Sequence, residues 1–294
     1  MEISIQLKEA ISIAILKDRE RYSGSDNAYA KTLGIGGSVF SRLKKGEREG
    51  LLSQGQWLNI GRKLQVTLGK STWKAVETDV YLEIKDDFDF CQQNSKSLIL
   101  VDDCGIGKTF CSRILISQMN NSFYIDASQY KTKRLLIKAL AKEIGSGTEG
   151  TYNEILANLK YYINALGNVF ICIDEAGDMD YAAFLEVKGL INGTTGRCGW
   201  YLIGADGLRA KITRGINNHK VGFKEIFDRL SAEFRSIVPT GGDDKKLFYQ
   251  KLLFDVASAN MENKSKINEN VKKCMAKGKS LRYLETLIII EKAA

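Results

Sequence analysis

Residues 98–114 read LILVDDCGIGKTFCSRI, and this stretch decides the fold. Its first four residues form an apolar run without polar alternation, which is typical of a central parallel strand buried on both faces. A glycine turn follows, and after it Phe110 and Ile114 recur at helical spacing. The stretch therefore predicts a strand, a loop and a helix in succession, as in an α/β fold with a parallel sheet.

The loop between this strand and helix has the residue types of a phosphate-binding P-loop, or Walker A motif. In such a loop the backbone N–H groups and the helix N-terminus surround the phosphates, a lysine neutralises their charge, and the next hydroxyl ligates Mg²⁺. Lys108 and Thr109 would take the last two roles, which predicts ATP and Mg²⁺ as cofactors. Nucleotide contacts are expected from Cys104, Gly105, Ile106, Gly107, Lys108, Thr109 and Phe110.

One position departs from the P-loop pattern, because Asp102 stands where the first glycine is expected. A carboxylate beside a triphosphate would repel it, unless the side chain turns outward or caps the loop. A glycine turn between an ordinary strand and helix is the alternative interpretation of the whole stretch.

A second apolar strand is expected over residues 169–173, and it ends in Asp174 and Glu175. Carboxylates at the tip of a buried strand resemble a Walker B motif. Asp174 would hold Mg²⁺ through water, and Glu175 would orient and deprotonate the attacking water. A solvated strand end is the alternative. The separation of about 65 residues from Lys108 leaves room for one intervening strand and helices.

The formal net charge of +8 is unevenly distributed over the 294 residues. Residues 1–70 carry 12 Lys/Arg against 7 Asp/Glu, residues 241–294 carry 11 against 7, and the middle has a net charge of −1. Basic ends around a nearly neutral core favour a polyanionic partner, nucleic acid first. A basic surface that serves only solubility is the alternative.

Several site classes are not expected from the composition. Six cysteines include no C-x-x-C pair, and His219 is the only histidine, which argues against a His/Cys metal site and Ser-His-Asp chemistry. Cysteines in a buried strand and in the loop are typical of reduced thiols in a cytoplasmic protein. No apolar run approaches the ~20 residues of a membrane span, and the N-terminus lacks a signal peptide's pattern, so no membrane partner is expected.

The N-terminal region predicts a series of helices. They are expected over residues 4–22, 28–34, 38–46 and 50–66. With Gly34 in a tight turn, the second and third resemble the helix-turn-helix of lambda-repressor-like domains, whose second helix enters the major groove. Arg42, Lys44 and Lys45 lie on the side that would contact DNA. A helical bundle that docks on protein, with a merely solvated basic face, is the alternative.

A second candidate DNA contact lies after the expected strand over residues 123–126. Lys131, Lys133 and Arg134 stand at the start of a predicted helix, where acidic residues are normally preferred. Positive charges there interact unfavourably with the helix dipole. A nucleic-acid phosphate backbone bound on the surface or in a channel would explain why they are present. Chance placement on the surface is a comparable explanation.

Two stretches resemble nucleotide-sensing elements of AAA+ ATPases. A strand is expected over residues 200–206, and near its end Asp206 or Ala205 occupies the neighbourhood of the residue known as sensor 1. Three helices are expected after Pro239, and residues 278–282, GKSLR, resemble the start of a sensor 2 helix in a small helical lid. That resemblance would point Arg282 at the nucleotide.

A third stretch, FDRLSAEF at 227–234, resembles the helix that carries an arginine finger. Such an arginine reaches a neighbouring subunit's γ-phosphate and stabilises the charge of the transition state. Arg229 is the first choice and Arg235 the second. A surface salt bridge is the alternative.

Taken together, the order of parts resembles the phage Mu B protein family of transposition ATPases, with IstB and TnsC-type ATPases as relatives. The resemblance rests on DNAYAKTLGIGGSVFSRLKKGE (26–47), the following helix with Trp57, GIGKT (105–109) and FDRLSAEF. It implies a helix-turn-helix domain over 1–70, an AAA+ core over 71–240 and a helical lid over 241–294. Glu175, Lys108 and Arg229 would then be the catalytic residues.

The resemblance also implies an activity and partners. Such a protein binds double-stranded DNA in an ATP-dependent, largely sequence-independent way and assembles with itself into helical filaments or rings. It hands target DNA to a DDE-type transposase and stimulates strand transfer, and hydrolysis disassembles it. Two other functions stay open: a transcriptional regulator whose P-loop domain senses nucleotide, and a replication loader or initiator ATPase. A metabolic kinase is disfavoured, since no acceptor-site motif is visible.

Overall fold

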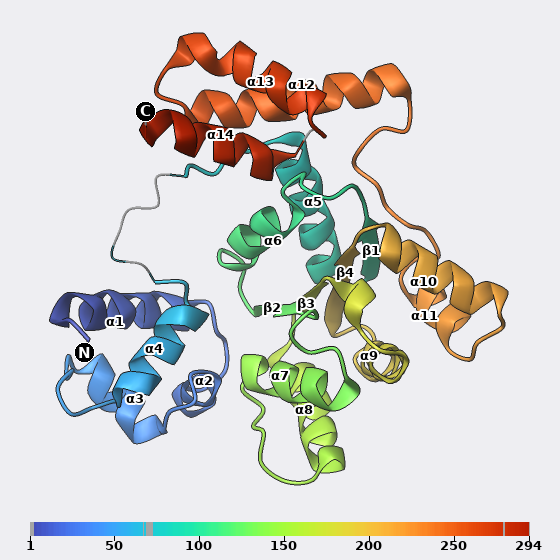
Figure 1. Cartoon of the computed structure of the whole chain (residues 1–294). Helices are drawn as coiled ribbons and strands as arrows, with labels where there is room; N and C mark the ends of the chain where they lie inside the picture. The colour runs from blue at the N-terminus through green and yellow to red at the C-terminus, as the bar shows by residue number, and fades with distance from the viewer. Residues whose placement is uncertain (1–2, 67, 69–72, 279, 294) are drawn as a thin grey trace.

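A computed structural model describes residues 3–66, 68, 73–278 and 280–293. An N-terminal group of helices, an α/β core and a C-terminal group of helices follow one another along the chain (Figure 1). The expected boundary between the first two parts, at residues 70 and 71, lies outside the described residues. No described helix is long and apolar enough to span a bilayer.

The core is built on four parallel strands, β1 (Ser97–Val101), β2 (Ser122–Asp126), β3 (Val169–Asp174) and β4 (Cys198–Gly204). Their order in the sheet is β1-β4-β3-β2, so β4 separates the strands that carry the two nucleotide motifs. Every residue of β1, β3 and β4 is buried, which accounts for their unbroken apolar runs. A single parallel bridge between Leu100 and Arg235 extends the sheet beyond β1.

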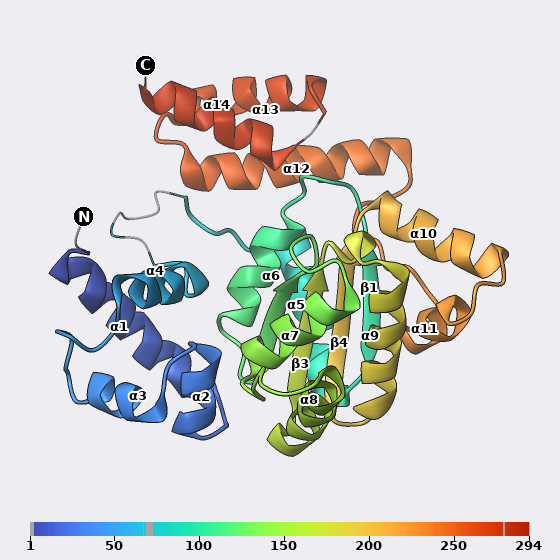
Figure 2. The same cartoon turned by 60° about the horizontal axis from the view of Figure 1, so that its bottom comes forward.

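Helices cover both faces of the sheet, so that adjacent residues of β3 face different cores (Figure 2). Phe170 packs against Phe88 of α5 (Asp79–Asn94), with ring centroids 4.7 Å apart, on the face shared with α6 (Lys108–Ile116). Ile171 lies in the opposite core with Phe184. The helices associated with that second core are α7 (Lys133–Ile144), α8 (Tyr152–Leu166), α9 (Tyr181–Gly193), α10 (Asp206–Asn217) and α11 (Phe223–Arg229). The predicted α/β class with a parallel sheet is confirmed.

The N-terminal helices are α1 (Ile5–Glu20), α2 (Asp26–Thr32), α3 (Gly37–Lys44) and α4 (Gln54–Lys63). The turn between α2 and α3 contains Gly34 at φ +70°, a conformation that favours glycine. Phe40 and Trp57 are completely buried beneath this turn and α4. The chain thus forms two short helices joined by a glycine turn. That these helices bind DNA as a helix-turn-helix stays a prediction.

The N-terminal helices are packed firmly on the α/β core. Tyr22 donates a hydrogen bond to the carbonyl of Ile144 at 2.8 Å, and Lys63 pairs with Glu143 at 2.9 Å. Buried apolar side chains run without interruption from α1 to β2 and α7. In both views α2 lies on the core side of this group and α3 farther out (Figures 1 and 2).

The C-terminal helices α12 (Gly242–Asn260), α13 (Ile267–Ala276) and α14 (Leu281–Ala293) lie over the edge of the sheet where the strands end (Figure 2). Asn260 of α12 binds the segment that leads into α5, which is called the entry segment below. Its amide oxygen accepts from the backbone N–H of Lys74 at 2.6 Å, and its amide nitrogen donates to the carbonyl of Lys74 at 3.1 Å. The C-terminal helices and the entry to the core are thereby joined beside the nucleotide motifs.

Candidate nucleotide site

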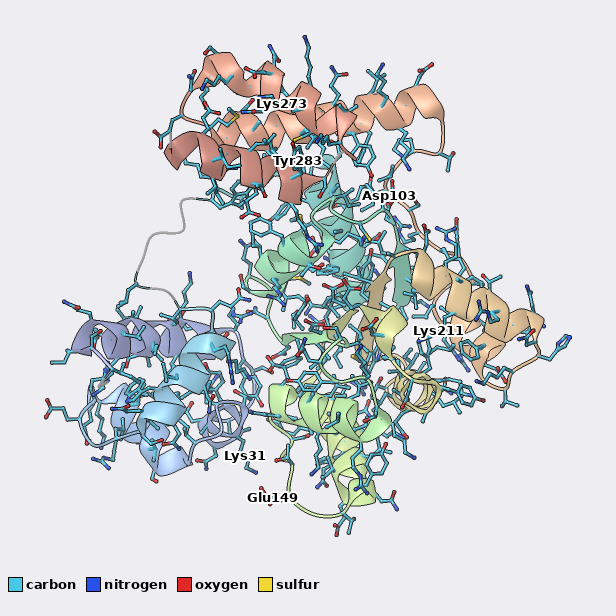
Figure 3. The ribbon with its side chains drawn as sticks, viewed as in Figure 1. Lys31, Asp103, Glu149, Lys211, Lys273 and Tyr283 are labelled. Atoms are coloured by element: carbon cyan, nitrogen blue, oxygen red, sulfur yellow. The ribbon has the colours of Figure 1, made fainter. Side chains whose placement is uncertain are left out.

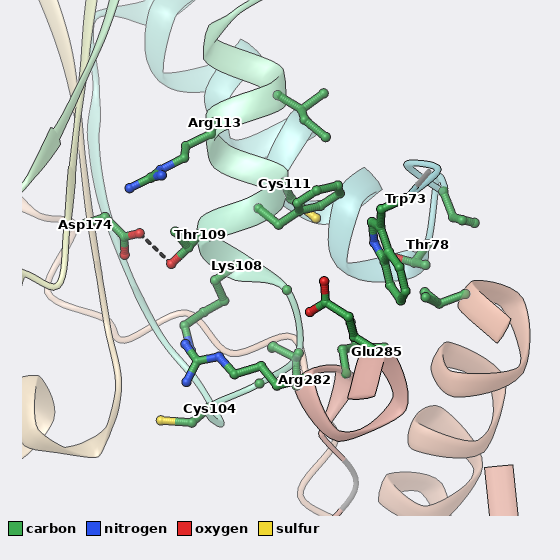
Figure 4. Close-up of a pocket in the computed structure, with 18 of the residues that line it drawn as sticks. Trp73, Thr78, Cys104, Lys108, Thr109, Cys111, Arg113, Asp174, Arg282 and Glu285 are labelled. Atoms are coloured by element: carbon green, nitrogen blue, oxygen red, sulfur yellow. Dashed lines mark hydrogen bonds between the residues drawn. The ribbon is translucent and has the colours of Figure 1, made fainter. Parts of the chain in front are cut away.

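A cavity of about 600 Å³ opens where the P-loop, β3, the entry segment and the C-terminal helices meet (Figure 4). A cleft at the carboxyl ends of parallel strands is the usual ligand position in such sheets. The structure brings ten of the predicted site residues to its wall: Cys104, Gly105, Ile106, Gly107, Lys108, Thr109, Phe110, Asp174, Glu175 and Arg282.

The P-loop backbone has the shape that a phosphate needs. Gly105 and Gly107 have φ values of +79° and +101°, and a Cβ on Gly105 would come within 2.5 Å of the Ser280 hydroxyl. Helix α6 begins directly after Gly107, so its unpaired N–H groups face the cavity. The Lys108 ammonium donates to the carbonyls of Asp102 and Asp103 at 2.9 and 2.7 Å, which holds its charge at the loop.

The Asp102 carboxylate binds backbone N–H groups, and Asp102 is not among the residues that line the cavity. Its carboxylate accepts hydrogen bonds from the backbone N–H groups of Ile237 and Val238, the latter at 2.9 Å, and from that of Asp103 at 2.7 Å. Only 6% of the residue is exposed. The unusual aspartate therefore fastens the P-loop to the segment beside β1, a role that a glycine cannot fill.

Restoring the motif glycine, Asp102→Gly, is expected to destabilise the protein by about 3 kcal/mol. Buried N–H donors would lose a charged acceptor, and the loop would gain backbone freedom in the unfolded state. Denaturant unfolding measures the change. Asp102→Asn is the matched control and should lose less, because it keeps one acceptor oxygen. Equal stability of the glycine variant and the wild type would contradict this role.

The predicted Mg²⁺ ligands are in direct contact. The Thr109 hydroxyl donates to Asp174 Oδ2 at 2.7 Å, and the Tyr124 hydroxyl donates to the same oxygen at 2.7 Å (Figure 4). Asp174 is 2% exposed, and its other oxygen accepts the Glu175 N–H at 2.9 Å. A hydroxyl and a carboxylate at the foot of a phosphate loop are the hard oxygen donors that Mg²⁺ prefers. These residues fit the ion.

Glu175 lies at the end of β3 in a left-handed backbone conformation, with φ 50° and ψ 39°. This conformation ends the strand and lets the chain turn into the short 3₁₀ helix η1 (Ala176–Asp178), while Glu175 itself lines the cavity. Burial raises the pKa of its carboxyl group, and the negative charge of Asp174 raises it further. A carboxylate with a raised pKa, adjacent to the metal ligand, is suited to accept a proton from water.

The comparison with known families agrees with this geometry, because residues 91–212 match the model described as an AAA domain. Among solved structures, NtrX from Brucella abortus in complex with ATP is similar at 13% identity and a TM-score of 0.44, over 87% of this chain. The chain spans only 60% of that NtrX chain. No protein with a curated description matches the sequence.

Sequence reasoning missed Arg113, which lines the cavity one helical turn beyond Thr109. Its guanidinium lies 5.0 Å from the centre of the Tyr124 ring and 3.9 Å from the carboxylate of Asp126. Arg113 thereby adds positive charge behind the Thr109–Asp174 pair. Its spacing of four residues from Thr109 on one helix was the signal that could have revealed it.

The apolar end of the cavity was also missed. Trp73 and Thr78 reach it from the entry segment, and Glu285 reaches it from α14, so it is assembled from distant parts of the chain (Figure 4). The hydrogen bonds between Lys74 and Asn260 hold Trp73 in this place. A local sequence pattern cannot predict this contact, because Lys74 and Asn260 are 186 residues apart in the sequence.

The lid side of the cavity is held close to the P-loop. The Leu281 N–H donates to the carbonyl of Gly105 at 2.9 Å, and Arg282 extends from the start of α14 toward Lys108 (Figure 4). Tyr249 and Lys245 of α12 both bind the carboxylate of Asp103, at 2.7 and 2.6 Å. Lys279, part of the sensor 2 resemblance, lies outside the described residues.

The two sensor 1 candidates, Asp206 and Ala205, differ in their positions. Strand β4 ends at Gly204, two residues earlier than expected, and Asp206 is an exposed residue in the first turn of α10. Ala205, the N-cap of α10, lines the cavity instead. Its methyl group offers no polar contact to a phosphate.

The two candidate finger arginines differ in their surroundings. Arg229 is exposed at the end of α11 and is not among the residues that line the cavity of this chain. Arg235 binds the carboxylate of Asp87 at 2.7 Å and pairs through its backbone with β1, so it fixes the edge of the sheet. Arg229 is therefore the better placed of the two to reach a neighbouring molecule.

The predicted DNA contacts lie on two separate surfaces. Lys133 and Arg134 are exposed in the first turn of α7, whereas Lys131 precedes the helix and pairs with Asp178 at 2.9 Å. The expectation that Lys131 belongs to that helix is wrong. Arg42 and Lys44 of α3 and Lys45, its C-cap, are exposed, and the first two pair with Glu47 and Asp26 at 2.7 and 2.8 Å.

Proposed function

We propose that the chain binds ATP with Mg²⁺ and hydrolyses it to ADP and phosphate. The observation that carries the proposal is the 2.7 Å contact between Thr109 and Asp174 beneath a P-loop whose lysine is already held at the loop. The hydroxyl of Thr109 and the carboxylate of Asp174 would hold Mg²⁺, which on binding neutralises charge on the β- and γ-phosphates.

Each residue then has a defined task. Lys108 and the N–H groups of the P-loop bind the phosphates, and Arg282 adds charge from the lid side. Glu175 orients a water molecule and accepts its proton as the water oxygen bonds to the γ-phosphorus. The bond between that phosphorus and the β–γ bridging oxygen breaks, and ADP leaves with the electron pair. Arg229 would stabilise the same charge from a neighbouring subunit.

We further propose that ATP drives assembly on double-stranded DNA, and that the assembled protein delivers this DNA to a DDE-type transposase. Support comes from the exposed basic residues on α3 and around the start of α7, and from the exposed Arg229. A site completed only by a neighbour makes ATP binding favour assembly, and assembly aligns many weak phosphate contacts. Hydrolysis would loosen them.

The double substitution Lys133→Ala and Arg134→Ala is expected to weaken ATP-dependent DNA binding and to lower the slope of log affinity against log salt by about 2. Each lysine or arginine that leaves a phosphate contact reduces counterion release by roughly one ion. Anisotropy of a labelled duplex measures both quantities. Lys272→Ala with Lys273→Ala on α13 removes the same charge elsewhere and should leave the slope unchanged. An unchanged slope in the α7 variant would contradict the contact.

Footprinting separates this function from that of a transcriptional regulator. Coverage that spreads over any sequence, and grows with protein concentration in the presence of ATP, is the expected result. Discrete protection of one sequence would identify a regulator and overturn the transposition proposal. That outcome would leave ATP binding at Lys108 intact.

A further inference from the structure

The turn that follows Glu175, residues 176–179, has only a few hydrogen bonds of its own. Its internal hydrogen bonds are those from the Asp178 N–H to Glu175 at 2.9 Å and from the Met179 N–H to Ala176 at 3.4 Å. These bonds leave the carbonyls of Gly177 and Met179 to be satisfied by other groups. A backbone carbonyl away from bulk water needs such a partner, and here one side chain supplies both hydrogen bonds.

That side chain is Lys211 of α10. The position of Lys211 is labelled in Figure 3. Its ammonium donates to the carbonyl of Met179 at 2.6 Å and to that of Gly177, and it lies 5.6 Å from the centre of the Phe184 ring. The side chain is half-buried, and burial lowers its pKa. A lysine withdrawn from water to bridge two carbonyls of one turn fixes the distance between that turn and its own helix.

The contact between α10 and the turn is close along the backbone as well. A Cβ on Gly177 would lie 3.2 Å from the backbone nitrogen of Leu208, so a glycine lets the turn approach the helix. On the other side, Lys131 pairs with Asp178, but both side chains of that pair are more than 40% exposed. An exposed pair constrains a turn weakly. The Asp180 N–H also donates to the carbonyl of Lys131 at 2.8 Å, which holds the end of the turn. Within residues 176–179, Lys211 is the side chain that bonds to two backbone carbonyls at once.

We propose that Lys211 is a positioning residue for hydrolysis, which holds the turn after β3 so that the Glu175 carboxylate points at the attacking water. The inference rests on the proposed ATPase function. Lys211 acts through geometry, because its contacts are with the backbone carbonyls of Gly177 and Met179. A misplacement of about 1 Å in a reacting group costs up to roughly 100-fold in rate.

Lys211→Met is the direct test, since methionine keeps an unbranched stem of similar bulk and removes all donors. We expect kcat for ATP hydrolysis to fall about 10- to 100-fold, while the Kd of a slowly hydrolysed ATP analogue stays within about twofold. Lys211→Arg, which can still donate to both carbonyls, should recover most of kcat. Should the methionine variant not fold, Lys211→Gln, which keeps one donor group, takes its place with an intermediate kcat expected.

Lys220→Met is the matched control and should keep the wild-type kcat. Lys220 belongs to the same part of the chain, and its ammonium stacks on Tyr181 at 3.9 Å, but no described contact joins it to the turn. The double variant with Glu175→Gln adds a second test. If Lys211 works through Glu175, the two losses should not multiply.

The outcomes separate the inference from the proposed function. A wild-type protein that binds but never hydrolyses ATP would refute the ATPase proposal. Hydrolysis by the wild type together with an unchanged kcat in Lys211→Met would overturn the role of Lys211 alone. Multiplicative losses in the double variant, or a weakened Kd equal to the loss in kcat, would overturn it as well, because both indicate a general structural effect.

Discussion

Lys108→Ala is expected to lower the affinity for ATP by roughly 100-fold and to abolish ATP-dependent DNA binding with it. The Lys108 ammonium is held at the mouth of the P-loop by the carbonyls of Asp102 and Asp103. A charge-assisted hydrogen bond to phosphate contributes about 1.5–3 kcal/mol, and the upper part of this range corresponds to a loss of roughly 100-fold. Titration of a fluorescent ATP analogue in the presence of Mg²⁺ measures the affinity.

The matched control for this experiment is Lys273→Ala. Lys273 lies on α13, away from the cavity, in an exposed pair with Glu269 at 2.7 Å (Figure 3). Its removal should change neither the ATP affinity nor the fold. If the Lys108 variant bound DNA with unchanged affinity in the presence of ATP, that result would contradict the proposed coupling between ATP binding and DNA binding.

Glu175→Gln is expected to lower the rate of ATP hydrolysis by about 100- to 10,000-fold while ATP binding persists. Glutamine keeps the size of the side chain and removes the base, and a positioned base contributes a factor of this order. The protein should then stay in its ATP-bound form, so complexes with DNA should last longer. Phosphate release measures the first effect, and dissociation from labelled DNA after addition of competitor measures the second.

Glu225→Gln on α11 makes the same chemical change at an exposed position and should leave both rates unchanged. A Glu175 variant that hydrolyses ATP at the wild-type rate would contradict the base assignment. A variant that loses ATP binding together with hydrolysis would show instead that Glu175 supports the structure of the cavity.

The nucleotide motifs could be predicted from sequence because their physics is local. An unbroken apolar run specifies a buried parallel strand, and a turn of two glycines followed by Lys108 and Thr109 specifies a phosphate loop. The same reasoning located β3 and the carboxylates of Asp174 and Glu175. Their contact then follows from the topology, because parallel strands deliver their carboxyl ends to one edge of the sheet.

The remaining parts of the site depend on contacts between residues far apart in the chain. The role of Asp102 requires the amides of Ile237 and Val238, which reach it only because the chain after α11 pairs with β1. The same pairing makes Arg235 a structural residue, although its local sequence resembles a finger helix. Strand β4 ends at Gly204 rather than at the expected residue 206, and of the two sensor 1 candidates Ala205 lines the cavity.

The packing of the N-terminal helices bears on how DNA would be bound. Residues 69–72, which follow these helices in the sequence, lie outside the described residues. The hydrogen bond from Tyr22 to Ile144 and the ion pair between Lys63 and Glu143 nevertheless join these helices to α7. The basic residues at the start of α7 and those of α3 therefore belong to one packed unit, which would present both to DNA in a fixed arrangement.

Electron microscopy of the protein on long duplex DNA, with Mg²⁺ and a saturating, slowly hydrolysed ATP analogue, tests the central claim most directly. The claim is that nucleotide bound at Lys108 joins one molecule to the next, so that many weak contacts to DNA act together. We predict continuous multi-subunit assemblies that disappear when the analogue is omitted. Isolated single molecules on DNA at saturating analogue would contradict it.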